Sequence, residues 1–227
     1  MSLLPSRRPS WTSGAAAWAA LTAFTAAAQA ADVPFASTYD VAAWQVAVAR
    51  PGVDGQLSSF PSSGFAPAVA ISGRQTDGIG WIANNASGTN GWGIGDWTFF
   101  VFRQTLDLSG HDPATAVLRF QWAADDSGQG FADRGTWTPK YRLNGGPLVD
   151  GVWPGGDTYG FGPETVISSG FVAGLNTLEF YVEGNGVTDG FALKALSFTA
   201  APVPEPAAMA LMLGGLAVVG GAARRRG

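Results

Sequence analysis

The chain has 227 residues, of which 13 are basic and 17 are acidic, so its formal net charge is −4, and it contains no cysteine. An acidic chain is a poor ligand for nucleic acids and anionic lipids, because both select basic surfaces. Without cysteine, disulfide frameworks, thiolate metal sites and cysteine nucleophiles are excluded, so packing must hold the fold together.

Residues 1–30 have the order of an export signal. Arg7-Arg8 precedes an alanine-rich apolar stretch over 15–28, and Ala28-Gln29-Ala30 supplies the small residues of a cleavage site. We therefore expect a signal-peptide helix in this segment and a mature chain that begins at Ala31. The paired arginines also fit twin-arginine export, but proline and serine follow where that signal carries apolar residues, which favours general secretion.

The segment 31–202 is more acidic than the whole chain, with eight basic and sixteen acidic residues. Its apolar runs are short and are separated by Gly, Pro, Asn and Asp, which is typical of many short strands. We expect one all-β domain over 31–199, a jelly-roll-like β-sandwich, followed by a linker over 200–206 that includes the first part of the C-terminal motif described below.

Alternating apolar residues locate the strands of this sandwich. The predicted strands are 44–48, 68–72, 80–83, 97–108, 116–124, 141–143, 148–149, 165–167, 177–183 and 191–199. A short helix from Asp40 competes with the first of them. Asn144-Gly145-Gly146 predicts a hairpin turn, because Asn and Gly tolerate positive φ. In the last strand the alternation changes parity, and a bulge near Lys194-Ala195 would restore one inward face.

The same alternation separates core residues from outward ones. The side chains expected to fill the core are Phe102, Leu106, Leu118, Phe120, Trp122, Leu178, Phe180 and Val182, together with Trp44 and Trp81. Gln104 is the polar residue on an inner face. Arg103, Thr105, Glu179, Tyr181 and Glu183 are expected to point outward.

The C-terminal segment 203–227 has three parts. Val203-Pro204-Glu205-Pro206 is an extended tetrapeptide, 207–223 is an uncharged apolar run, and a basic cluster follows at Arg224, Arg225 and Arg226. As a helix the run reaches about 25 Å, just short of a hydrocarbon core of about 30 Å. We expect a transmembrane helix and basic tail over 207–227. The arginines should stay on the cytoplasmic side of the inner membrane, with everything before Pro204 across it.

This order of motif, apolar run and arginines resembles the sorting signal of bacterial PEP-CTERM proteins. The resemblance implies an exosortase, a membrane-embedded cysteine transpeptidase-like enzyme, as partner. It also implies cleavage near the Pro-Glu-Pro motif and delivery to the cell surface or the surrounding polysaccharide. The alternative is an ordinary tail anchor, but an apolar run alone does not call for a Pro-Glu-Pro at its outer edge.

A second resemblance concerns the ectodomain. The segments 102–110, 112–116, 122–125 and 169–178 are similar to the galactose-binding-like jelly-roll ectodomains found in many PEP-CTERM proteins. The similarity covers about half of the mature chain and much of it is turn and core chemistry, so it indicates a fold more than a ligand. This chain departs from simpler members in a longer insertion between Asp126 and Lys140.

Catalytic patterns are sparse. His111 is the single histidine and lies in a turn, so a Ser-His-Asp triad would need a nucleophile with no recognisable elbow. Glu179 and Glu183 lie four residues apart along one strand, about 13 Å, which exceeds the roughly 5–10 Å of glycosidase pairs. We therefore expect no enzymatic activity.

Two kinds of binding residue remain. Asp125, Asp126 and Asp133, with glycines between them, could ligate Ca²⁺ at the edge of the sandwich, although an acidic solvated loop is the simpler interpretation. Four tryptophans in glycine-rich stretches, namely Trp92, Trp97, Trp137 and Trp153, could stack on sugar rings or merely cover the ends of the sandwich.

The sequence therefore predicts an exported, non-catalytic surface or matrix protein. It would be anchored in the inner membrane as a precursor and then associate with extracellular polysaccharide. The alternative is a structural or adhesive matrix protein with no defined glycan ligand.

Overall fold

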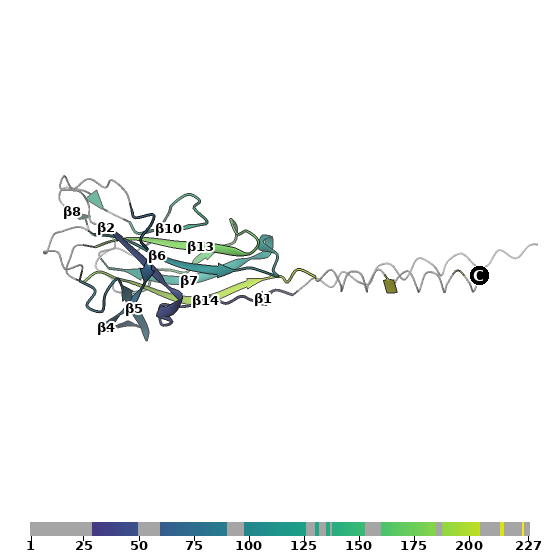
Figure 1. The fold of residues 1–227 in the computed structure, drawn as a ribbon, viewed down its shortest axis with the longest axis horizontal. Helices are drawn as coiled ribbons and strands as arrows, with labels where there is room; N and C mark the ends of the chain where they lie inside the picture. The colour runs from purple at the N-terminus through teal and green to yellow at the C-terminus, as the bar shows by residue number, and fades with distance from the viewer. Residues whose placement is uncertain are drawn as a thin grey trace, which may run out of the picture.

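The computed structural model describes residues 29–49, 60–89, 98–125, 130–131, 135–136, 138–152, 160–184, 188–204, 214–215 and 224. These residues form an all-β sandwich of two antiparallel six-stranded sheets, drawn as two layers in Figure 1. A separate pair, β8 (Gly130–Phe131) and β9 (Gly135–Thr136), lies at the left of that view.

The first sheet is built around β14. Its order is β12 (Thr165–Ile167), β7 (Val117–Ala124), β14 (Phe191–Ala200), β5 (Ile79–Ala83) and β4 (Val69–Thr76), and β1 (Ala31–Asp32) pairs with the far end of β14. The second sheet has the order β11 (Val149–Asp150), β10 (Lys140–Leu143), β13 (Leu175–Gly184), β6 (Thr98–Asp107), β2 (Gln45–Ala49) and β3 (Ala66–Pro67).

All ten predicted strands are confirmed, most with boundaries shifted by only one or two residues. The strand after Asp40 is confirmed as β2, and the competing helix is limited to a three-residue 3-10 turn, η1 (Val41–Ala43), before it. A second 3-10 turn, η2 (Pro113–Thr115), lies between β6 and β7. β1, β3, β8 and β9 were not predicted, because two-residue strands have no alternation to detect.

The core lies between the two sheets. Of the ten residues predicted to fill the core, nine lie in it, and each of these is at most 2% exposed. Phe180 is at its centre, with ring centroids 4.7 Å from Phe191 and 5.0 Å from Trp122. Such aromatic pairs contribute about 0.5–1.5 kcal/mol each beyond their buried area. Gln104 is buried as predicted, and its Nε2 donates to the Ala36 carbonyl at 3.3 Å.

Trp81 is buried as predicted, but in a second, smaller cluster on the outer face of the first sheet. Its members are Ile71, Trp81, Ala83, Ala123 and Ala192, with Phe161 packed against them. Neighbours of opposite parity, such as Ile82 and Phe191, belong to the main core. Both faces of this sheet are therefore apolar around the β5–β14 pairing.

The predicted bulge in β14 is confirmed, and it falls at Leu196, one residue later than expected. The register with β7 shifts between Ala195 and Ser197. Leu196 is 42% exposed, whereas Phe198 is 2% exposed and faces the core. The extra residue thus returns the end of the strand to its inward face.

The outward residues of β13 have the predicted parity, but they are not exposed. Glu179, Tyr181 and Glu183 are only 4–9% exposed. Phe60 packs edge-on against Tyr181, with ring centroids 4.9 Å apart, and Arg142 pairs with Glu179. Alternation predicts the face on which a side chain lies, and neighbouring side chains decide whether water reaches it.

Candidate functional site

The two ends of the sandwich differ, and each is defined by the strands that meet there. Ala31 pairs with Ala200, so the chain enters and leaves the sandwich at one end, on the right of Figure 1. We call this the terminus end; it also carries the β6–β7 loop, the β10–β11 turn and the β12–β13 loop. At the opposite, distal end β2, β5, β7 and β13 finish and β6, β10 and β14 begin.

At the terminus end the linker after β14 is held by residues 109–115. The backbone N–H of Asp112 donates to the Ala201 carbonyl at 2.7 Å, and the Val203 N–H donates to the Gly110 carbonyl at 2.8 Å. The N–H of Ala201 donates to Thr115 Oγ1 at 2.8 Å. His111 and Pro202 thereby form an antiparallel β-bridge.

Residues 109–115 are themselves fixed by short-range hydrogen bonds. Asp107 Oδ1 accepts from the Ser109 N–H at 2.8 Å, and hydrogen bonding to Ser109 lowers the pKa of the Asp107 carboxyl. Asp112 caps η2 by accepting from the Ala114 N–H at 3.0 Å. Thr115 Oγ1 also donates to the Asp112 carbonyl at 2.8 Å. The surface that receives the linker is thus ordered independently of the linker.

The rest of the terminus end is nearly uncharged. The turn 144–148 and the loop 168–174 contain no charged residue. Exposed aliphatic side chains gather there instead, with Leu175 67%, Val203 53% and Val172 49% exposed.

An open groove of about 610 Å³ lies between these two uncharged segments. Tyr141, Asn144 and Val149 line one side, and Val166 and Ser169 line the other. Burial raises the pKa of the Tyr141 phenol. Asn144 is already engaged, because its Nδ2 donates to the Gly170 carbonyl and to Asn176 Oδ1, and its Oδ1 accepts from the Thr177 N–H. The groove is therefore mainly aliphatic.

The outer face of the second sheet carries a row of planar polar groups. Strand pairing aligns Gln45 with Arg103, Arg103 with Glu179, and Glu179 with Arg142, across four neighbouring strands. We call these four residues the polar row. Arg103 donates from Nη2 to Gln45 Oε1 at 2.6 Å, and its guanidinium stacks 3.6 Å from the centroid of the Phe65 ring.

Glu179 is the anchor of the polar row. Its Oε2 accepts from Arg142 Nε at 2.6 Å and from the Tyr181 hydroxyl at 2.8 Å. Burial lowers the pKa of Arg142, but hydrogen bonding to Glu179 and its charge outweigh burial and raise that pKa. Burial, together with Glu179, raises the pKa of Tyr181. Arg142, Glu179 and Tyr181 therefore form one hydrogen-bonded and ion-paired group.

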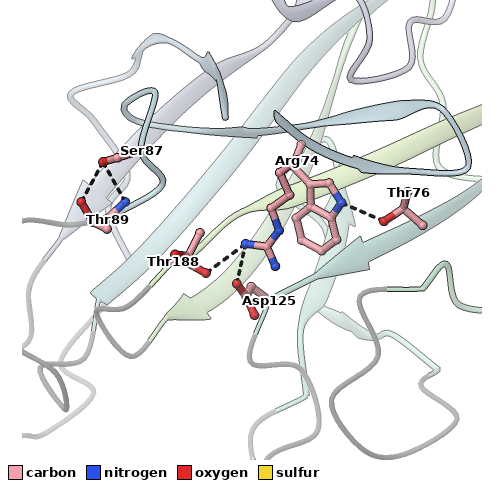
Figure 2. Close-up of polar contacts among 7 residues, drawn as sticks. Arg74, Thr76, Ser87, Thr89, Asp125 and Thr188 are labelled. Carbon is pink, nitrogen blue, oxygen red and sulfur yellow. Dashed lines mark hydrogen bonds and ion pairs between the residues drawn. The ribbon is translucent and has the colours of Figure 1, made fainter. Parts of the chain in front are cut away.

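The distal end contains a partly buried ion pair, shown in Figure 2. Arg74 Nη1 donates to Asp125 Oδ2 at 2.7 Å and to the Thr188 carbonyl at 3.1 Å. The Arg74 guanidinium lies 4.2 Å from the centroid of the Trp81 ring, and Trp81 Nε1 donates to Thr76 Oγ1 at 2.9 Å. These contacts join β4, β5, β7 and the segment before β14.

Many predicted site residues lie outside the described residues. These are Trp92, Trp97, Trp137, Trp153, Asp126, Asp133, Glu205, Pro206, Arg225 and Arg226. Asp125 is described and pairs with Arg74, as above. In the described part of the chain, no group of three His, Asp or Glu side chains comes together to hold a metal ion. Calcium binding therefore stays a prediction.

The apolar stretches predicted to be helical also lie largely outside the described residues. Gly214, Gly215 and Arg224 are helical and exposed. A search of the described residues finds no helix long and apolar enough to cross a membrane.

Sequence reasoning missed the polar row and the contact between the linker and residues 109–115. Each depends on which strands or loops become neighbours. The outward parity of Arg103 and Glu179 was the available signal for the row, but it did not reveal that they align.

Comparison with protein families identifies the C-terminal segment. A family model for the PEP-CTERM protein-sorting motif matches residues 202–226. A search of curated proteins gave no match. The signal indicates an exported protein that is membrane-anchored before processing and that an exosortase sorts.

Proposed function

We propose that this protein is a non-catalytic surface or matrix protein whose sandwich associates with extracellular polysaccharide. The observation that supports this association best is the polar row on the outer face of the second sheet. Four strands spaced about 4.8 Å apart make the row roughly 14 Å long, a length suited to a chain-like ligand. Gln45, Arg103 and Arg142 are its solvent-accessible members, and Glu179 between the two arginines is buried.

The chemistry of the polar row also favours a sugar ligand. Amide, carboxylate and guanidinium groups donate and accept hydrogen bonds in one plane, and each guanidinium has five N–H donors. The described contacts use two donors of Arg103 and one of Arg142, so both retain donors for a ligand. The partly exposed Phe65 ring lies against the Arg103 guanidinium and supplies apolar surface.

The two-sheet architecture is compatible with the galactose-binding-like jelly-roll resemblance, which we keep as part of this proposal. Glycan binding by the loop tryptophans is a second candidate within the same function.

The arrangement of the ends favours one orientation of the precursor. Both chain ends leave the sandwich at the terminus end, so a signal peptide and a C-terminal anchor would reach the same membrane without crossing the domain. Two of the loops at this end, 144–148 and 168–174, are uncharged, and exposed aliphatic side chains gather beside them, which suits a position next to lipid. The strands of the second sheet would then run roughly perpendicular to the membrane, and the outer face of this sheet would point away from the first sheet, in a direction parallel to the membrane surface.

The positions and contacts of Glu179 and Glu183, the carboxylate pair considered for glycoside hydrolysis, favour a non-catalytic role. Glu179 is held by Arg142 and Tyr181, and Glu183 lies four residues farther along the same strand. An acid–base pair in a retaining or inverting glycosidase needs two carboxylates about 5–10 Å apart.

The test is binding of the mature protein to polysaccharide from the native host, measured by affinity electrophoresis. Gln45→Ala with Arg103→Ala should weaken binding by about tenfold or more, because it removes the exposed half of the row and leaves the Glu179 pair intact. Arg119→Ala is the matched control, since Arg119 is an exposed arginine of the first sheet paired with Glu164 at 2.5 Å.

Three outcomes would redirect the proposal. Loss of binding in Trp137→Ala or Trp153→Ala, with the row variant unaffected, would move the glycan site to the tryptophan loops. Equal binding by all variants would exclude both sites. No binding by the wild-type protein would favour the structural or adhesive alternative.

A further inference from the structure

We propose that residues 109–115 are a latch that holds the linker Ala201–Val203 and must open before the sorting enzyme can process the Pro-Glu-Pro motif. The inference depends on the sorting signal and is independent of polysaccharide binding. Three hydrogen bonds and one β-bridge join the two segments, and the matched signal begins at Pro202, inside the latched linker.

The latch occupies the backbone groups that a sorting enzyme would need. Peptides are commonly recognised in extended form through their main-chain N–H and carbonyl groups. Proline has no N–H, so among residues 202–206 only Val203 and Glu205 have one. The Val203 N–H already donates to the Gly110 carbonyl at 2.8 Å, and the Ala201 carbonyl accepts from Asp112 at 2.7 Å.

The receiving side of the latch is ordered without the linker. Asp107 and Asp112 cap this loop through the Ser109 and Ala114 N–H groups. Gly110 has a φ of +79°, in the left-handed region that glycine adopts without strain. Opening therefore releases only the linker and leaves the sandwich intact, so the motif can alternate between a latched and a free state.

Thr115 is the side chain that closes the latch. Its hydroxyl accepts from the Ala201 N–H and donates to the Asp112 carbonyl, each at 2.8 Å. Thr115→Val keeps the shape and removes both bonds. Only the bond from Ala201 joins the linker to this loop, so we expect roughly fivefold faster loss of the tail from the full precursor, as losing one ordinary hydrogen bond would give.

The rate is measured in membranes from the native host with a tail-specific antibody. Thr105→Val is the matched control, because Thr105 is an exposed threonine on the outer face of β6. Faster tail loss in Thr115→Val alone, with an unchanged melting temperature, supports the latch. A rate equal to wild type, or a slower one, overturns it.

A reversible disulfide between the linker and residues 109–115 would hold the latch closed, whereas Thr115→Val weakens it. The bonds of Asp112 and Val203 flank His111 and Pro202 as a non-hydrogen-bonded antiparallel pair, whose Cα atoms typically lie about 4.5 Å apart. That separation falls within the range of about 4.4–6.8 Å that disulfides bridge. The chain has no cysteine, so His111→Cys with Pro202→Cys creates a single defined bridge.

The double variant, oxidised and then freed of oxidant, should keep its tail where wild type treated in the same way loses it, and it should lose the tail after reduction. The reduced form is the reference, so any effect of replacing Pro202 is present in both arms. Tail loss from the oxidised precursor at the rate of the reduced one would overturn the latch. Failure to process even wild type in the same membranes would instead argue against the sorting assignment itself.

Discussion

The two ends of the sandwich are held together by different forces. At the terminus end, hydrogen bonds made largely by backbone groups fix short, exposed loops. At the distal end, the Arg74–Asp125 ion pair and the Trp81 ring connect strands of the first sheet. Exposed backbone contacts open at little cost, whereas a partly buried charge that loses its partner is costly. The difference indicates that the terminus end can rearrange for processing while the distal end supports the fold.

Among the substitutions that test this comparison, we expect the largest loss of folding stability at Arg74. Arg74→Met should destabilise the domain by about 3 kcal/mol, because it leaves the Asp125 carboxylate without its arginine in a mostly buried position. The free energy of unfolding can be measured by urea titration.

Arg119→Met, which breaks an exposed pair on the same sheet, is the control and should cost less than about 1 kcal/mol. Equal losses in the two variants would mean that the distal ion pair has no special structural role.

A smaller effect is expected from Tyr181 at alkaline pH. Burial and Glu179 raise the pKa of Tyr181 in the folded state above its ordinary value of 10.0. Its contribution to stability is therefore complete below about pH 10 and is lost at higher pH, because the unfolded chain then releases the phenol proton more readily.

Tyr181→Phe should cost about 1 kcal/mol at pH 8, from the lost hydrogen bond to Glu179, and should flatten the decline above pH 10. The measurement is urea unfolding at several pH values. Parallel pH curves for the two proteins would contradict a buried, proton-retaining Tyr181.

The smallest effect is expected at the terminus end, from Asp107→Ala. Hydrogen bonding to Ser109 lowers the pKa of Asp107, so its stabilising contribution is present above the unfolded value near 3.8 and is lost as pH falls below it. The carboxyl is exposed, so the melting temperature at pH 7 should drop far less than in Arg74→Met.

The difference between wild type and Asp107→Ala should shrink as pH falls from 7 to 3 and vanish only below the folded pKa of Asp107, as calorimetry over this pH range would show. A loss as large as that of Arg74→Met would mean that the terminus end is as important to the fold as the distal end.

Sequence alone predicted the strands and the core well, because both follow from local alternation. Phe102, Phe120 and Phe180 are buried as their parity requires. The outward direction of Tyr181 was predicted correctly, but its burial was not foreseen, since Phe60 from a distant segment covers it.

The candidate sites were less predictable for the same reason. The polar row requires the register of β2, β6, β13 and β10, which no local pattern specifies. The latch is made largely of main-chain groups, so its residues carry almost no compositional signal. The sorting motif could be found because its chemistry is consecutive in the chain.

The pairing of β1 with β14 has a consequence for the timing of secretion. β14 lies in the middle of the first sheet, between β7 and β5, so that sheet cannot assemble until the last strand has been made. In a chain that is exported from its N-terminus, β1, β5 and β7 cross the membrane before β14 and lack this shared pairing partner until β14 follows. Residues 207–223 follow almost immediately, so final folding and arrival of the tail at the membrane coincide. A chain that stops before residue 191 lacks both the central strand β14 and the sorting signal. We therefore expect it to stay unfolded and to be degraded by proteases.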